Sequence, residues 1–92
     1  MRDMDRSGPA AYVPAMDWDH ELDALGLLCP LPVLKARKRL EALPPGAVLR
    51  VLADDPAAVI DFPFFCSESG HELVSTTDAE GGTAYLIRKP GA

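Results

Sequence analysis

Cysteine is scarce in this chain of 92 residues, with only Cys29 and Cys66 present. Two thiols allow at most one disulfide, which is too few for a domain built on a disulfide framework. They also cannot supply the four ligands of an all-cysteine zinc site within one chain. The sequence therefore excludes both classes and leaves two thiols whose roles need an explanation.

Long apolar runs are absent as well. The first 19 residues contain charges and two prolines, but no stretch of the ~7–15 apolar residues that a signal peptide needs. No segment approaches the ~18 apolar residues of a membrane span. We therefore expect a flexible tail at residues 1–19, a domain at residues 20–92, no membrane contact and a cytoplasmic location. Thiols stay reduced there unless they are used in catalysis.

Positive charge is also in short supply, because 9 Lys and Arg residues face 14 Asp and Glu residues, for a net charge of −5. Nucleic-acid binding needs a basic surface, so an acidic chain is a poor candidate for it. Aromatic residues make up only 7% of the chain, and no group of them offers a stacking platform for RNA bases. The remaining composition is that of one small globular domain without direct nucleic-acid binding.

Hydrophobic periodicity predicts the element order β-α-β-α-β-β. Strand patterns occur at residues 21–25, 48–53, 73–77 and 83–88. Helical spacing of apolar residues occurs from about Pro30 to Leu43 and from Pro56 to about Ser69. The last two strands should form a hairpin around a loop of five residues, 78–82. We expect an α/β two-layer sandwich, in which a four-stranded mixed sheet carries both helices on one face.

The second predicted helix has clear boundary signals. Asp54 and Asp55 precede Pro56, which is typical of an aspartate cap with proline at the first helical position. Pro63 should kink or reset the helix, and Gly70 should close it. Its inward face is predicted to contain Ala58, Val59, Phe62, Phe65 and Cys66.

The most informative segment is Gly26-Leu27-Leu28-Cys29-Pro30-Leu31-Pro32, which places a cysteine at the junction of strand and helix. Gly26 ends the strand, and Pro30 and Pro32 rigidify a helix start where a missing N–H costs nothing. The remaining N–H groups and the helix dipole direct positive potential at the thiol. This arrangement predicts a lowered pKa for Cys29 and a nucleophilic thiolate.

Four cations follow within five positions, namely Lys35, Arg37, Lys38 and Arg39. Their field also favours a thiolate. Lys35, Lys38 and Arg39 are candidates for docking an acidic partner face or for stabilising an anion on Cys29. The alternative is a solvated helix face, which is what a run of charges usually forms. The stem of Arg37 is expected to lie along the apolar stripe of the helix.

Each thiol also has a less specific interpretation. Cys29 lacks a second cysteine three residues away, so it suits carrying a group better than a local disulfide cycle, but it could instead be a small buried residue. Cys66 is interpreted as a buried structural cysteine, with a resolving or second sulfur-binding thiol as the alternative.

His71 is expected to be structural or exposed. Cys29, Cys66, His20 and His71 lack zinc-ligand spacing, so no metal is expected.

Several landmarks resemble one known family. Residues 22–32, Leu-Asp-Ala-Leu-Gly-Leu-Leu-Cys-Pro-Leu-Pro, are similar to the region around the Cys-Pro-x-Pro motif of the TusA/SirA-like sulfur-carrier family. Later landmarks of that family follow in the same order, at Ala53-Asp54-Asp55-Pro56, Phe65-Cys66 and Gly70-His71-Glu72-Leu73. The resemblance extends from about Leu22 to Lys89 and leaves out the tail.

The resemblance implies a fold and a chemistry. Family members are β-α-β-α-β-β sandwiches that accept sulfane sulfur as a persulfide on the motif cysteine, here Cys29, with Gly26, Pro30 and Pro32 supporting its thiolate. The implied donors are a cysteine desulfurase or a rhodanese-like protein. The implied acceptors serve tRNA 2-thiouridine formation, molybdenum-cofactor enzymes or sulfur oxidation. No cofactor is implied, and a monomer is expected. The alternative function is a non-catalytic, thiol-dependent interaction or regulatory module.

Overall fold

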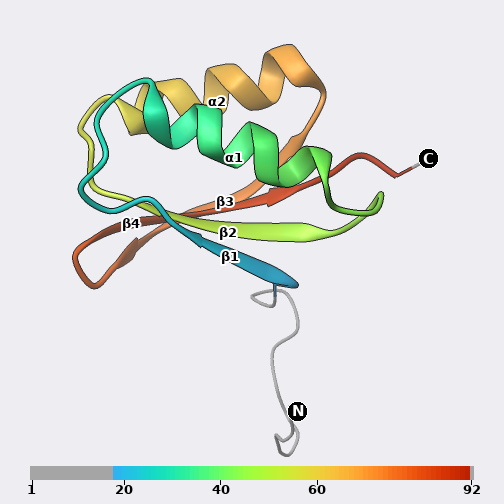
Figure 1. Ribbon diagram of the computed structural model, residues 1–92, viewed down its shortest axis with the longest axis horizontal. Coiled ribbons are helices and arrows are strands. Elements are labelled where there is room, and N and C mark those ends of the chain that lie inside the picture. Colours follow the sequence, from blue (N-terminus) through green and yellow to red (C-terminus); the bar gives the residue numbers. More distant parts are fainter. Residues whose placement is uncertain (1–17, 92) are drawn as a thin grey trace, which may run out of the picture.

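The computed structural model describes residues 18–91. Four strands form one sheet in the order β1-β2-β4-β3: β1 (His20–Asp23), β2 (Val48–Ala53), β3 (Glu72–Ala79) and β4 (Gly82–Arg88). Two helices, α1 (Leu31–Glu41) and α2 (Ala58–Ser69), cover one face of this sheet (Figure 1). β1 and β2 are parallel, whereas β4 is antiparallel to both β2 and β3. The predicted two-layer sandwich with a mixed sheet is confirmed.

The core lies between the helices and the covered face of the sheet. Phe62 of α2 stacks on Tyr85 of β4 with ring centroids 4.6 Å apart. Both side chains are almost fully buried, and Leu40 of α1 is inaccessible to solvent beside them. The helices contribute small and large residues at four-residue spacing, namely Pro32, Ala36, Leu40, Ala58, Phe62 and Cys66. This spacing places one stripe of each helix against the sheet.

Helix α2 departs from the prediction on one side chain. Val59 was expected to point inward, but 54% of it is exposed. It follows buried Ala58 by one position, which is about a quarter of a helical turn away from the core. The helix runs through Pro63 without interruption, and Pro63 is exposed on its outer surface. Gly70 ends the helix in a left-handed conformation, with φ of +82°, as predicted.

The hairpin between β3 and β4 is tighter than predicted. Its turn contains only Glu80 and Gly81, and Gly81 adopts a positive φ of 85°. The expected five-residue loop was wrong, because Asp78 and Ala79 pair with β4 and prolong β3. Pairing in the sheet outweighs the low intrinsic strand preference of aspartate.

Residues at both ends of the described chain are fixed by hydrogen bonds. The Lys89 ammonium donates to the carbonyl oxygens of Leu43, at 2.7 Å, and Glu41, at 3.3 Å, at the end of α1. Most of the predicted tail lies outside the described residues. Of its last two residues, Asp19 exchanges hydrogen bonds with Val48 of β2 at 2.8 and 2.9 Å, and the Trp18 ring lies 4.6 Å from the Arg50 guanidinium.

No helix within residues 18–91 has the length and apolar character needed to cross a membrane.

Candidate functional site

Cys29 lies in the loop between β1 and α1, at the end of the molecule where both helices begin (Figure 1). The Asp23 carboxylate accepts the Leu25 N–H at 2.9 Å and turns the chain after β1. Pro30 is the N-cap of α1, and Pro32 lies in its first turn with its ring buried. Cys29 itself is exposed. The structure thus places the thiol at the predicted helix start and excludes the interpretation of a small buried residue.

The loop that carries Cys29 is held by two aspartates from the loop that follows the neighbouring strand β2. The Asp55 carboxylate accepts the Cys29 N–H at 2.9 Å. The Asp54 carboxylate accepts the Gly26 N–H at 3.0 Å. The prediction that this pair caps α2 was wrong, because the N-cap of α2 is Ala57 and makes no side-chain cap bond. The two aspartates instead join the loops that follow β1 and β2, which are neighbours in the sheet.

The electrostatic environment of the thiol also differs from the prediction. The pKa of Cys29 is raised above its ordinary value of 9.0, first by a hydrogen bond with the Asp61 side chain. Desolvation and the negative charges of Asp61 and Asp55 act in the same direction on this pKa. The lowered pKa expected from the start of α1 was therefore wrong. Two carboxylates, brought in by α2 and the loop before it, act on this pKa in the direction opposite to that expected of the helix start.

Cys29, Asp55 and Asp61 form a compact group. The Cys29 sulfur and one oxygen of each carboxylate all lie within 4.8 Å of one another. Within residues 18–91, this is the one group of three or more side chains with metal-binding atoms that close together. His20, His71 and Cys66 lie outside it, so the four-residue zinc arrangement considered from the sequence does not form.

Cys66 has a different environment. Only 3% of it is exposed, and burial raises the pKa of its thiol to about 11. Both cysteines are free. Buried thiols with a raised pKa are poor nucleophiles, so the burial agrees with the prediction of a structural cysteine, and the role of Cys66 stays a prediction.

His71 belongs to a small structural cluster at the end of α2. Its ring stacks on Phe65 at 5.4 Å between centroids, and its Nδ1 lies 2.7 Å from the Ser69 hydroxyl. Partial burial and the nearby charge of Lys89 lower the pKa of this imidazole below 6.5. The structural interpretation of His71 is therefore the one that its contacts favour.

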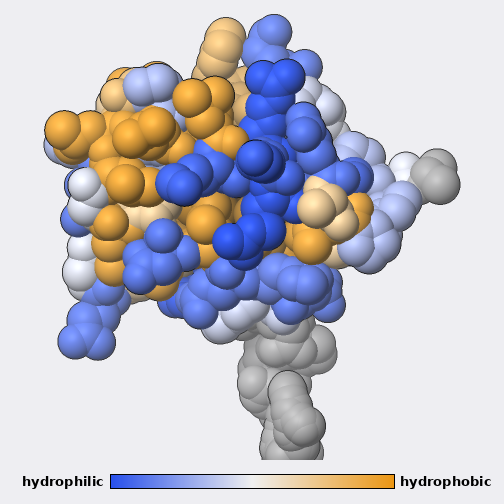
Figure 2. Space-filling view, in the orientation of Figure 1, coloured by the Kyte–Doolittle hydropathy of each residue, from blue (hydrophilic) through white to orange (hydrophobic). Residues whose placement is uncertain are grey.

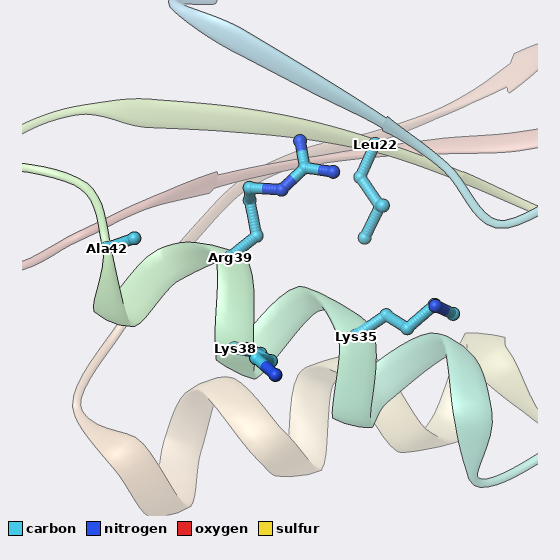
Figure 3. Close-up of a pocket in the computed structure, with 5 residues that line it drawn as sticks. All are labelled: Leu22, Lys35, Lys38, Arg39 and Ala42. Carbon is cyan, nitrogen blue, oxygen red and sulfur yellow. The ribbon is translucent and has the colours of Figure 1, made fainter.

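Three predicted docking residues line one hollow on the surface of α1. Lys35, Lys38 and Arg39 surround it with Leu22 and Ala42, and its volume is about 340 Å³ (Figure 3). We call it the basic hollow. The Arg39 guanidinium reaches across to β1 and donates to the Glu21 carbonyl oxygen at 3.1 Å.

The fourth cation of the run behaves differently. The Arg37 side chain is 64% exposed and pairs with Glu41 at 3.6 Å. Its stem was expected to lie along the apolar stripe of the helix, but the structure shows it on the outer side of α1. Arg37 therefore does not line the basic hollow.

Exposed apolar side chains lie on α1, on α2 and in the loop before α1, and sequence reasoning missed them. Leu28 is 67% exposed, and Ile60 is 71% exposed. We call this set the apolar rim; its members are Leu28, Leu31, Leu34, Val59, Ile60 and Phe64. Figure 2 shows apolar residues gathered at the end of the molecule where the helices begin, next to a hydrophilic band. Isolated exposed apolar residues are ordinary, but a contiguous patch at a reactive group is typical of an interaction surface.

Comparison with known proteins agrees with this geometry. The family model described as "Sulfurtransferase TusA" matches residues 20–89. The chain belongs to this family. It is 48% identical over 73 residues to the sulfur carrier protein TusA of Allochromatium vinosum, a match that covers 79% of this chain and 96% of that protein. The crystal structure of a SirA-like protein from Desulfitobacterium hafniense matches with a TM-score of 0.66 and 27% identity, covering 80% of this chain and 100% of that one.

Proposed function

We propose that this protein is a sulfur carrier that accepts sulfane sulfur as a persulfide on Cys29 and passes it to an acceptor protein. The observation that carries this proposal is the exposed thiol at the head of α1, held in place through its own backbone N–H by Asp55. Membership of the sulfurtransferase TusA family supports the same reaction. A fixed backbone with an exposed side chain lets the thiol enter the active site of a larger protein.

The proposed chemistry consists of two thiol exchanges. In the first, the Cys29 thiol loses its proton and its sulfur attacks the outer sulfur of the donor's persulfide. A new S–S bond forms on Cys29, the donor's S–S bond breaks, and the donor leaves as a thiolate that takes up a proton. In the second, an acceptor thiolate attacks the outer sulfur on Cys29 and releases Cys29 as a thiolate. Each step exchanges one thiol and one persulfide, so no external oxidant or reductant is needed.

The surface around Cys29 fits a carrier that meets more than one partner. We propose that the apolar rim packs against the entrance of a partner's active site, and that Lys35 and Lys38 attract an acidic face beside it. The donor would be a cysteine desulfurase or a rhodanese-like protein. The acceptor would be a protein of tRNA 2-thiouridine formation, molybdenum-cofactor enzyme maturation or sulfur oxidation.

The second candidate function, a thiol-dependent regulatory module, receives less support. A redox switch between the two cysteines would require Cys66 to react, yet Cys66 is buried and has a raised pKa. No observation within residues 18–91 favours this alternative over the sulfur carrier.

The experiment that tests the proposal uses the purified full chain with a cysteine desulfurase and cysteine. We expect intact-mass spectrometry to show a gain of one sulfur atom that a reductant removes, and peptide mapping to locate it on Cys29. Cys29→Ser should abolish the gain, and Cys66→Ala should retain it. If the wild type and Cys29→Ser gain sulfur equally, or neither gains any, the proposal is refuted.

A further inference from the structure

The carboxylates beside Cys29 come from a segment far from it in sequence. Asp61 lies in the first turn of α2, and Asp55 lies in the loop between β2 and α2. Oxygens of both carboxylates lie within 4.8 Å of the Cys29 sulfur and of each other. Asp55 also holds the loop in place, because its carboxylate accepts the Cys29 N–H. Asp61 shares no such backbone bond with the loop, and its effect is on the thiol itself.

The charges that face the thiol are therefore negative. From α2 and the loop before it come Asp61 and Asp55, and both act on the Cys29 pKa in the direction that keeps the proton on sulfur. From α1 comes the helix N-terminus, with no charged side chain before Lys35. Among residues 18–91, the ion pairs are Arg37 with Glu41, Arg50 with Glu21 and Arg88 with Glu72. None of them includes Asp55 or Asp61.

This arrangement is unexpected for a nucleophile. A thiolate is the reactive form of cysteine, and reactive cysteines are usually found beside cations. Here the surrounding apolar rim offers no positive charge, since its six members are Leu, Val, Ile and Phe residues. A cation that a partner places against Asp61 would favour the thiolate.

We propose that Asp61, assisted by Asp55, is an electrostatic restraint that keeps Cys29 a thiol in the free protein and is released when a partner places a cationic side chain against Asp61. This inference rests on the proposed function, because the partner is a sulfur donor or acceptor. The partner chemistry that fits is an apolar entrance with a Lys or Arg beside its own sulfur-bearing group. When the cation pairs with Asp61, the Cys29 S–H bond breaks, the proton passes to water, and the electron pair stays on sulfur.

The restraint has a direct consequence for reactivity. If the pKa of Cys29 falls by one unit, the thiolate fraction at neutral pH rises about tenfold, while the intrinsic nucleophilicity falls with a Brønsted coefficient of about 0.4–0.5. The net gain in reaction rate is therefore roughly three- to fourfold for each unit. A free carrier would thus be slow to react with adventitious small electrophiles and would react readily only in a complex.

The test compares two reagents on five proteins: the wild type, Asp61→Asn, Asp61→Lys, Asp55→Asn and a control, Glu68→Gln. Glu68 lies on the same helix, about 10 Å further along its axis, and Gln removes the same charge. The first reagent is iodoacetamide, which is neutral and carries no partner surface. The rate of Cys29 alkylation is measured against pH by peptide mass mapping. The second reagent is a cysteine desulfurase with cysteine, for which the rate of persulfide formation on Cys29 is measured.

The proposal predicts that the two rank orders are reversed. With iodoacetamide, the pH midpoint should fall in the order wild type, Asp61→Asn, Asp61→Lys, and the neutral-pH rate should rise by roughly three- to fourfold per pKa unit. With the desulfurase, the wild type should be loaded fastest and Asp61→Lys slowest, because the variants no longer attract the partner's cation. Glu68→Gln should match the wild type with both reagents. Asp55→Asn should also lower the pH midpoint of alkylation, by less than Asp61→Asn does. It tests the restraint even if the Asp61 variants fold poorly.

Three results separate the possible failures. An unchanged or higher alkylation midpoint in both Asp61→Asn and Asp55→Asn refutes the restraint. An equal acceleration with both reagents refutes its release by a partner cation. If the alkylation midpoints shift as expected but no variant forms a persulfide, the sulfur-carrier function fails and the restraint on the thiol stands.

Discussion

The hydrogen bond from the Cys29 N–H to the Asp55 carboxylate offers a quantitative test of how the reactive loop is held. The two atoms are 2.9 Å apart, and 26 residues separate their positions in the chain. Asp55→Ala removes the acceptor of this hydrogen bond. A hydrogen bond to a charged group contributes about 1.5–3 kcal/mol. Because this site is exposed, we expect the lower end, about 1.5 kcal/mol, for the local opening of the loop.

That free energy sets the size of the measurable effect. Since about 1.4 kcal/mol corresponds to a factor of ten in an equilibrium constant, the Cys29 amide should exchange its hydrogen about tenfold faster in Asp55→Ala. Native-state hydrogen exchange by NMR at mildly acidic pH measures this rate one amide at a time. Asp55→Asn keeps an oxygen acceptor without the charge, so its Cys29 amide should exchange at an intermediate rate.

The same experiment contains its own controls. The Asp54 carboxylate accepts the Gly26 N–H at 3.0 Å, so Asp54→Ala should accelerate hydrogen exchange at the Gly26 amide. Its effect on hydrogen exchange at the Cys29 amide should be smaller. Asp78→Ala, on the exposed hairpin strand, should change neither amide. If the Cys29 amide of Asp55→Ala exchanges at the wild-type rate, the loop is held by other contacts, and the assignment of Asp55 as its anchor is incorrect.

Two further predictions concern stability. In Gly82→Ala the new Cβ would lie 2.5 Å from the Ala53 carbonyl oxygen, so the strands must shift. The free energy of unfolding in urea should therefore fall by about 1–3 kcal/mol. Gly91→Ala is the matched control, because no atom lies within 4 Å of its new Cβ, and it should leave the urea midpoint unchanged. The pKa of His71 is lower in the folded chain than its ordinary 6.5, so its contribution to stability is complete above pH 6.5 and is lost as the pH falls through the folded value. The urea midpoint of the wild type should therefore drop on acidification by more than that of His71→Gln, and equal drops would contradict this account of His71.

The sequence alone determined the elements and much of the site. Local patterns of apolar residues predicted the four strands, the two helices and their order, because periodicity depends on neighbours along the chain. The position of Cys29 at the head of α1 followed from the two prolines, and the burial of Cys66 followed from its apolar neighbours. The turn at Glu80 and Gly81 was misjudged, because the pairing that extends β3 involves a partner strand rather than local preference.

Only the tertiary structure decided the electrostatics of the thiol. Sequence reasoning weighed the charges adjacent to Cys29 in the chain, which are those of α1, and these predicted a lowered pKa. The parallel pairing of β1 with β2 brings the loops after both strands to one edge of the sheet, and with them Asp55 and Asp61. An electrostatic interaction depends on distance in space and not on separation in sequence. The pKa of Cys29 is for this reason raised, by residues 26 and 32 positions away from it.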